Sequence, residues 1–323
     1  MRHALIAALF VTSCAGQPVA DDLWRAQQLE SSSPAQAQQI YAAFEQRCKT
    51  QPLVNDDCAL AAVRSAELAE DYQEWQQAYA TWLSAASMSH VGTTRARALS
   101  RAASLAHARL GDDKSARELA WRCVENEPGE RSADDALTLA VRIDEPRDWA
   151  ALAAKLADLQ VKLARFDVGE HIAYARALLL TRHDRNADAI AAFDALAATW
   201  PRSSLRDEAM WRAANLARAA GDFQGALRRL SAMVAKRDAL VAGGYNYLQL
   251  DNAQLLIGKI YADDLHDFEH AAEAFELLAD KFKASSLRDD ALLELTRVRR
   301  AENDKDAACT AVSRLLREFP DSN

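Results

Sequence analysis

The 323-residue sequence has few residues that interrupt helices, with only 10 glycines and 7 prolines. Alternating runs of Val, Ile, Thr and Tyr are nearly absent as well, which argues against a sheet-rich fold. Alanine fills much of the chain instead, as in "ALTLA" and "DALAA", together with Leu, Arg, Glu and Gln. These residues have the highest intrinsic helix propensities. The composition therefore predicts an all-α protein.

The chain also lacks an excess of positive charge. It has 39 Lys and Arg residues against 47 Asp and Glu residues, and a net charge of -8. The cations are scattered among acids and form no stripe, so the electrostatic footprint of a nucleic-acid-binding protein is missing. Glycine is too sparse for a phosphate-binding loop, and no G-x-S-x-G motif is present. We expect no nucleic-acid partner and no cofactor.

Long apolar runs are missing too, and the one at the start of the chain, residues 4–11, is too short to span a bilayer. It follows Arg2 and His3 and leads into "VTSC", which ends at Cys14. This order of basic start, short apolar core and small residues is typical of a secretory signal. "VTSC" resembles the lipobox of bacterial lipoproteins. The alternative is a plain secretory signal with an incidental cysteine.

The lipobox resemblance implies that residues 1–13 are a signal peptide and that Cys14 becomes the acylated N-terminus. Residues 14–22 would then form a tether, and the lipid anchor would be the only contact with the membrane. Ala15 follows the cysteine, and by the same resemblance this indicates the outer membrane, with the protein facing the periplasm.

Four cysteines remain after Cys14. An exported protein folds in an oxidising compartment. Cys48 and Cys58 flank the short connection "KTQPLVNDD" and could be bridged or free. We expect Cys123 and Cys309 to be buried free thiols, because several helical hairpins would separate them.

A spacing of 12 residues between an alanine and a proline occurs three times. A turn-forming sequence such as "LGDDKSA" or "ENDKDAA" stands before each alanine, and the same turn occurs in "AAGDFQGAL" and "HDFEHAAEAF". Four positions after the alanine comes a large residue that would fill the space between two helices. The alanine–proline pairs are Ala116 and Pro128, Ala189 and Pro201, and Ala308 and Pro320; Ala226 and Ala271 take the alanine position elsewhere, and the large residues are Phe193, Leu230, Phe275 and Val312.

This pattern resembles the tetratricopeptide repeat, a helix–turn–helix unit of about 34 residues. The resemblance implies a right-handed superhelical α-solenoid of about eight hairpins over residues 23–323. The repeats are clearer over 97–128 and 170–320 and degenerate over 23–96 and 129–169. Within the latter stretch, residues 132–166 are expected to form one hairpin with Pro146 near its turn.

The sequences "SSLRDEA" and "SSLRDDA" begin at Ser203 and Ser285, 82 residues apart. In each, the second serine and the aspartate have the S-x-x-D form of a capping box. We therefore predict that Ser204 and Ser286 cap the next first helix. The extra length of these two hairpins would lie in a loop around Gly243 and Gly244 and in an enlarged turn at "ADDLHD".

In solenoids of this family, first helices line a concave groove that binds a polypeptide, and repeat positions 2, 5, 9 and 12 usually face it. Trp211 is the strongest candidate hot spot, although packing against a neighbouring hairpin is the alternative. Four other tryptophans, Trp75, Trp82, Trp121 and Trp149, are assigned to the core. The resemblance places the following residues in the groove: Tyr174, Glu208, Trp211, Asn215, Arg218, Asp290, Leu293, Arg297 and Arg300.

The combination of signal and repeat resembles the branch of repeat lipoproteins that contains the outer-membrane assembly lipoprotein and the Tol-linked cell-division coordinator. This implies a non-enzymatic scaffold that binds other envelope proteins, in outer-membrane protein assembly or in coordination of the envelope with division. An envelope hydrolase or metal-dependent peptidase is one alternative. It would use "HDFEH", His266 to His270, in the order H-x-x-E-H. That motif needs a continuous helix, so we interpret both histidines as turn residues. A self-assembling structural component is the other alternative.

Overall fold

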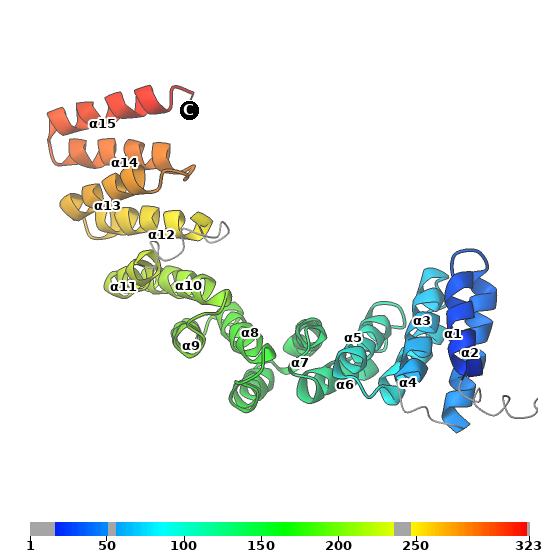
Figure 1. The fold of residues 1–323 in the computed structure, drawn as a ribbon. Coiled ribbons are helices and arrows are strands. Elements are labelled where there is room, and N and C mark those ends of the chain that lie inside the picture. The colour runs from blue at the N-terminus through cyan, green and yellow to red at the C-terminus, as the bar shows by residue number, and fades with distance from the viewer. Residues whose placement is uncertain (1–16, 51–55, 236–246, 322–323) are drawn as a thin grey trace, which may run out of the picture. The chain divides into compact units, whose positions relative to one another are not determined.

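A computed structural model describes residues 17–50, 56–235 and 247–321, and all regular structure in these ranges is helical (Figure 1). Cys14, the signal peptide, Gly243 and Gly244 lie outside the described residues. The helices of the N-terminal part are α1 (Gln17–Leu29), α2 (Pro34–Thr50), α3 (Asp57–Asp71), α4 (Trp75–Met88), α5 (Gly92–Ala108), α6 (Asp113–Asn126), α7 (Ser132–Lys162) and α8 (Val168–Arg182).

The described residues of the C-terminal part contain seven further α-helices and one π-helical turn, η2 (Ile260–Asp264). The chain forms two compact units, unit 1 (Met1–Ile172) and unit 2 (Ala173–Asn323), and the division falls within α8. The remaining helices are α9 (Asn186–Thr199), α10 (Leu205–Ala219), α11 (Phe223–Val234), α12 (Tyr247–Lys259), α13 (Phe268–Lys281), α14 (Arg288–Ala301) and α15 (Lys305–Glu318).

The helices pair in chain order into helix–turn–helix hairpins, which confirms the all-α hairpin prediction. Counting the two halves of α7 as one pair, the described residues contain eight hairpins: α1/α2, α3/α4, α5/α6, α7, α8/α9, α10/α11, α12/α13 and α14/α15. Hairpins occupy the degenerate stretches as well as the clear ones.

α7 is two helices joined at Asp148, whose backbone (φ -160°, ψ 89°) is not helical, two residues after Pro146. The Asp148 side chain caps the second half by accepting a hydrogen bond from the Ala151 backbone N–H at 2.9 Å. The first half contacts the start of α6 through Asp144 and Arg117. The second half contacts the end of α6 through Lys155 and Glu125 at 2.9 Å. The chain therefore reverses near Pro146, as the sequence predicts.

A short turn of constant design connects the two helices in four of the eight hairpins among the described residues. A residue with positive φ comes first: Gly111, Gly221, His266 and Asn303 have φ of 66°, 81°, 54° and 64°. An aspartate follows each of them, and its carboxylate accepts a hydrogen bond from the backbone N–H three residues on. The left-handed residue ends the first helix and the aspartate caps the second. The four caps are Asp112, Asp222, Asp267 and Asp304.

The repeated alanines lie where the two helices of a hairpin meet, and all five are buried: Ala116, Ala189, Ala226, Ala271 and Ala308. Phe193, Leu230 and Phe275 are fully buried, whereas Val312 in the last hairpin is half-buried. Each of α6, α9 and α15 ends two residues before its proline. α13 also ends two residues before Lys283, where the proline is missing, because the fully buried Phe282 fixes the same exit from the helix.

The predicted capping boxes are wrong, because the first serine of each pair, and not the second, accepts a backbone hydrogen bond at the start of the helix. Ser204 makes no capping hydrogen bond. The hydroxyl of Ser203 accepts from the Leu205 backbone N–H at 3.0 Å, and that of Ser285 accepts from Leu287 at 3.0 Å. Ser285 also donates to the buried Asp251 of α12. The repeated serine thus forms a local turn and, in the second copy, ties that turn to a neighbouring helix.

Two further expectations need correction. α1 begins at Gln17, so residues 17–22, which were expected to belong to the tether, are part of a helix. Pro18 is tolerated in the first turn of a helix, where its missing N–H has no partner to lose. The first half of the enlarged turn "ADDLHD" belongs to the π-helical turn η2, which continues α12 and accommodates part of the extra length within the helix.

Gly221 provides a direct test of the hairpin turn. Its φ is 81°, and a Cβ there would contact nothing within 4 Å. Gly221→Ala should therefore destabilise unit 2 by about 1 kcal/mol through backbone conformation alone, measured by urea denaturation. Gly129→Ala is the control, because φ there is not positive and the new methyl would make an ordinary 3.8 Å contact with Phe166. An equal loss in both variants would contradict the turn model.

Glu45 of α2 predicts a pH dependence of unit 1. Its carboxyl is buried, and burial raises its pKa above the ordinary 4.5, while Lys49, Ser65 and Ser84 oppose the shift. The folded state then binds more protons than the unfolded state between these two pKa values, so stability falls as pH rises through that range. Glu45→Gln should stabilise unit 1 at neutral pH more than below the ordinary glutamate pKa, measured by denaturation. An equal gain in stability from Glu45→Gln at the two pH values would contradict this account.

Candidate partner-binding surfaces

The predicted groove residues of α8 and α10 lie together in unit 2. The Tyr174 hydroxyl accepts a hydrogen bond from Arg212 Nε at 2.9 Å and lies 3.4 Å from Glu208 Oε1. Arg212 also pairs with Glu208 at 2.7 Å. Burial raises the pKa of Tyr174, and the guanidinium of Arg212 opposes this. Tyr174 and Glu208 therefore belong to a connected polar cluster that joins two first helices.

Trp211 is half-buried and packs against the main hydrophobic cluster of unit 2. Much of the Trp211 side chain therefore packs inside unit 2, as the packing alternative proposes. Asn215 is held in place by a hydrogen bond to the Trp211 carbonyl at 2.8 Å. Neither side chain projects freely as a hot spot would.

Two predicted groove arginines form ion pairs with the π-helical turn. Arg218 Nε lies 2.6 Å from Asp264 Oδ2, and Arg297 Nη2 lies 2.7 Å from Asp263 Oδ1. Arg297 also bonds to Glu294 at 2.7 Å, which raises the pKa of its guanidinium against the opposing effect of burial. η2 therefore connects α10 to α14, and these two arginines have a structural role.

The α14 end of the predicted groove is open. Asp290, Leu293 and Arg300 are exposed, and the Leu293 side chain keeps 57% of its surface accessible. An exposed leucine between charged residues is a suitable contact for a partner's apolar side chain. Arg297 is exposed as well. The other five of the nine predicted groove residues are half-buried.

The four tryptophans assigned to the core differ in how deeply they are buried. Trp82 and Trp121 are buried, as predicted. Trp75 and Trp149 are only half-buried, so the core assignment is wrong for them. Arg109 covers Trp75, with its guanidinium carbon 4.6 Å from the ring centroid. A surface cation stacked on an indole ring stabilises this half-exposed position.

The sequence analysis missed a second surface, on the first helices of unit 1. α3 and α5 are buried on most sides, and each exposes one narrow stripe: Leu60, Arg64 and Glu67 on α3, and Thr93, Arg97 and Arg101 on α5. We call these residues the α3–α5 surface. Their spacing of three or four residues places each set along one side of its helix.

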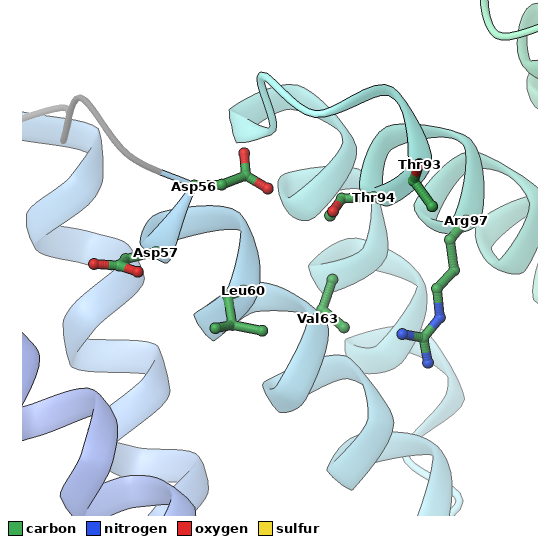
Figure 2. A pocket seen from close by; sticks show the side chains of 7 residues that line it. All are labelled: Asp56, Asp57, Leu60, Val63, Thr93, Thr94 and Arg97. Atoms are coloured by element: carbon green, nitrogen blue, oxygen red, sulfur yellow. The ribbon is translucent and has the colours of Figure 1, made fainter. Parts of the chain in front are cut away.

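A cavity of about 290 Å³ lies between the two helices at one end of this surface (Figure 2). Leu60 and Val63 contribute its apolar lining, and Leu60 is 38% exposed. Its polar lining comes from Asp56, Asp57, Thr93, Thr94 and Arg97. Asp56 is fixed there by the Ser89 hydroxyl at 3.0 Å and the His90 backbone N–H at 2.9 Å. The cavity is a concave apolar spot with carboxylates on one side and a guanidinium on the other.

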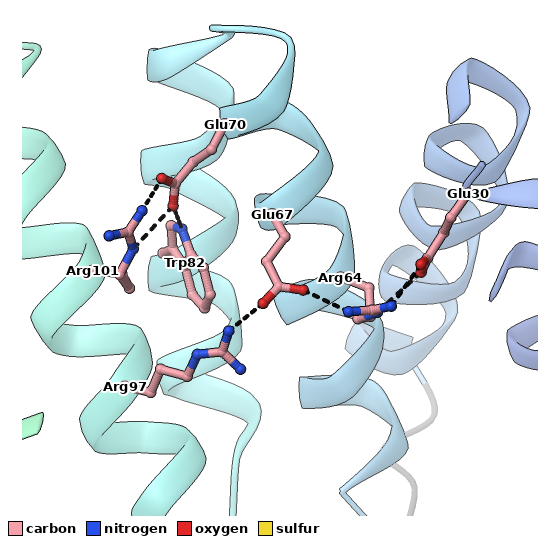
Figure 3. Close-up of polar contacts among 7 residues, drawn as sticks. All are labelled: Glu30, Arg64, Glu67, Glu70, Trp82, Arg97 and Arg101. Atoms are coloured by element: carbon pink, nitrogen blue, oxygen red, sulfur yellow. Dashed lines mark hydrogen bonds and ion pairs between the residues drawn. The ribbon is translucent and has the colours of Figure 1, made fainter. Parts of the chain in front are cut away.

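A chain of ion pairs holds the rest of the α3–α5 surface in position (Figure 3). Arg64 bridges Glu30 at 2.6 Å and Glu67 at 2.9 Å, and Glu67 pairs in turn with Arg97. A parallel link joins Arg101 to Glu70, which also accepts from the Trp82 indole N–H at 2.6 Å. Because each acid contacts a group on a different helix, the network fixes the distance between α3 and α5.

Little in the sequence indicates this surface. The proline that ends second helices elsewhere is missing upstream, so residues 23–96 could not be aligned to repeat positions. The informative signal would have been the i, i+3 and i+4 spacing of Leu60, Arg64 and Glu67 within an alanine-rich helix.

Of the two "HDFEH" histidines, His266 lies in a hairpin turn, as interpreted from the sequence, whereas His270 lies in the first turn of α13, so the turn interpretation is wrong for it. His266 has positive φ, and its ring lies 3.3 Å from the Ala262 carbonyl. The ring of His270 contacts Asp267 at 2.7 Å, which raises its pKa, and stacks on Tyr261 with ring centroids 5.2 Å apart. Among the residues that the structure describes, no group of three His, Cys, Asp or Glu side chains is arranged to hold a metal ion.

Cys48 and Cys58 form a disulfide, which decides between the two possibilities that the sequence left open. It joins α2 to α3 inside the apolar cluster of the first hairpins. Cys123 is a buried free thiol, as expected, and burial raises its pKa to about 12. Cys309 is exposed, which contradicts the expectation, because α15 turns only its Ala308 and Ala311 side inward.

In the parts of the chain that the structure describes, no helix has the length and apolar character needed to cross a membrane.

No family model matches the sequence, and no curated protein matches it significantly. Solved structures with similar folds include a tetratricopeptide repeat protein from Parabacteroides merdae, 16% identical, covering 88% of this chain and 99% of that one, with a TM-score of 0.39. The C-terminal part of a repeat protein from Cytophaga hutchinsonii is 13% identical over 88% and 97% of the two chains, with a TM-score of 0.41.

A signal-transduction ATPase with a tetratricopeptide repeat sensor, from Pyrococcus horikoshii, is 11% identical over 94% of this chain and 46% of that one, with a TM-score of 0.48. The fold assignment rests on the hairpins themselves, with their buried alanines and capped turns.

Reduction of the disulfide should destabilise unit 1. Closing a loop of this length in the unfolded chain contributes about 2–3 kcal/mol by the loop-entropy model. Denaturation with and without reductant should show this difference in the wild type. A Cys48→Ala/Cys58→Ala variant should not respond to reductant, and Cys309→Ser should respond like the wild type. A wild type that is insensitive to reductant would contradict the bridge.

Proposed function

We propose that this protein is a non-enzymatic scaffold of the bacterial envelope, anchored by lipid at Cys14, that binds another polypeptide on the first-helix faces of its hairpins. The observation that carries the binding part is the α3–α5 surface. It joins a shaped apolar cavity to charged side chains whose positions are fixed by ion pairs within α3 and between α3 and α5.

Such a surface suits a protein ligand for a physical reason. A partner that docks on prearranged side chains loses less conformational entropy than one that must order them. The cavity is open and small, which fits one apolar side chain of a longer segment better than a whole small-molecule substrate. Charged groups around it would fix the orientation of that segment. Leu293 and its charged neighbours on α14 offer a second contact of the same type in unit 2.

The anchoring part rests on the "VTSC" sequence and on Cys14. The disulfide supports export, because such bonds persist in oxidising compartments. Outer-membrane location follows from Ala15 by resemblance to known lipoproteins. Participation in outer-membrane protein assembly or in coordination of division is part of the same proposal.

Site-specific photo-cross-linking in living cells would test the binding part. A photoreactive amino acid at Leu60 or at Leu293 should cross-link to a defined polypeptide, identified by mass spectrometry. The control position is Val161 in the second half of α7, which is 78% exposed and lies outside both surfaces. The same products from Val161, or no product from either leucine, would contradict the proposed surfaces.

A further inference from the structure

Trp24 is an exposed aromatic residue at the N-terminal end of unit 1. Its neighbours Leu23 and Ala26 are buried in the apolar cluster that α1 forms with α2. Trp24 lies on another side of the helix, and 64% of its surface is accessible. The outer side of a terminal repeat is ordinarily polar. Asp21, Arg25 and Gln28 follow that rule, and Trp24 departs from it.

The proposed acylation site is close to this tryptophan along the chain. Only Ala15 and Gly16 separate Cys14 from Gln17, where α1 begins. Three Cα steps span at most about 11 Å. The rise from Gln17 to Trp24 adds about 10 Å along the helix. An anchor at Cys14 would therefore hold α1 at the bilayer surface, within reach of the headgroups if the helix lies along it.

The chemistry of Trp24 and of this end of unit 1 suits that position. Tryptophan favours the interface between water and hydrocarbon, because its ring is largely apolar and its N–H can be hydrogen-bonded. Arg47 bridges Asp22 at 2.7 Å, so the end of α2 lies beside the first half of α1. Arg47 and Lys49 at that end, with Arg25 on α1, are exposed cations that lipid phosphates would attract. Asp21 is the exposed acid that opposes them.

We propose that α1 lies along the membrane surface with Trp24 inserted among the lipid headgroups. The proposal rests on the proposed lipid anchor at Cys14, and its ligand is the phospholipid interface. Two attachment points, the acyl chains and Trp24, would fix the direction in which the first hairpins leave the membrane. A single flexible attachment would leave that direction free.

Quenching by brominated lipids tests the proposal in the full-length lipidated protein. The protein is reconstituted into vesicles of phosphatidylethanolamine and phosphatidylglycerol whose acyl chains carry bromine. We expect the bromolipid to quench part of the tryptophan emission in the wild type, and Trp24→Phe to lose most of that quenching. Trp75→Phe is the matched control, because it removes a tryptophan from the same unit without altering α1, and should retain the quenching.

The outcomes separate the two proposals. Mass spectrometry that finds Cys14 unacylated would overturn the anchor and this inference with it. An acylated protein with equal quenching in the wild type and in Trp24→Phe would overturn only the membrane contact. A full-length Cys14→Ala variant tests the alternative that a second copy of this chain packs on α1. If the Trp24 emission of that variant shifts to the blue with rising protein concentration and without vesicles, the contact belongs to that copy and the membrane contact is overturned.

Discussion

The buried alanines of the second helices determine how closely the two helices of a hairpin approach, and much of the architecture depends on that distance. Where Ala189, Ala226 and Ala271 meet the first helix, a larger side chain would have to displace it. Gly258 of α12 shows the same requirement from the opposite side, since a Cβ there would lie 2.4 Å from the Phe275 ring. Close pairing also buries most of each first helix and leaves one narrow stripe for contact with other molecules.

Polar side chains then fix the positions of the turns and of neighbouring helices. Asp222 and its equivalents cap second helices, and Ser285 with Asp251 links the turn before α14 to α12 of the preceding hairpin. Glu67 and Arg97 hold two first helices at a fixed separation. Because such exposed or half-exposed pairs contribute little to stability individually, their main effect is to define positions. In unit 1 these ion pairs hold the side chains of the α3–α5 surface in position. In unit 2 they bind Arg218 and Arg297 to the aspartates of η2, so that these guanidinium groups are already paired.

The hairpins could be predicted from the sequence because their determinants are local. The alanine–proline spacing, the Gly-Asp and Asn-Asp turns and the break near Pro146 each act over a few residues. The candidate site was harder to predict because its determinants connect distant residues. Arg218 and Asp264 are 46 positions apart, and their contact depends on the π-helical turn η2, which periodicity does not reveal. The exposure of Cys309 likewise follows from its place on the last helix rather than from its neighbours in sequence.

The central claim is that close helix pairing at the alanine position forms each hairpin, and α11 allows it to be tested within one helix. Ala226 is buried against the first helix, whereas Ala232 is exposed. The free energy of unfolding of unit 2, measured by urea denaturation, should fall by about 1–3 kcal/mol in Ala226→Leu. It should change little in Ala232→Leu. Equal stability of the two leucine variants would contradict the account.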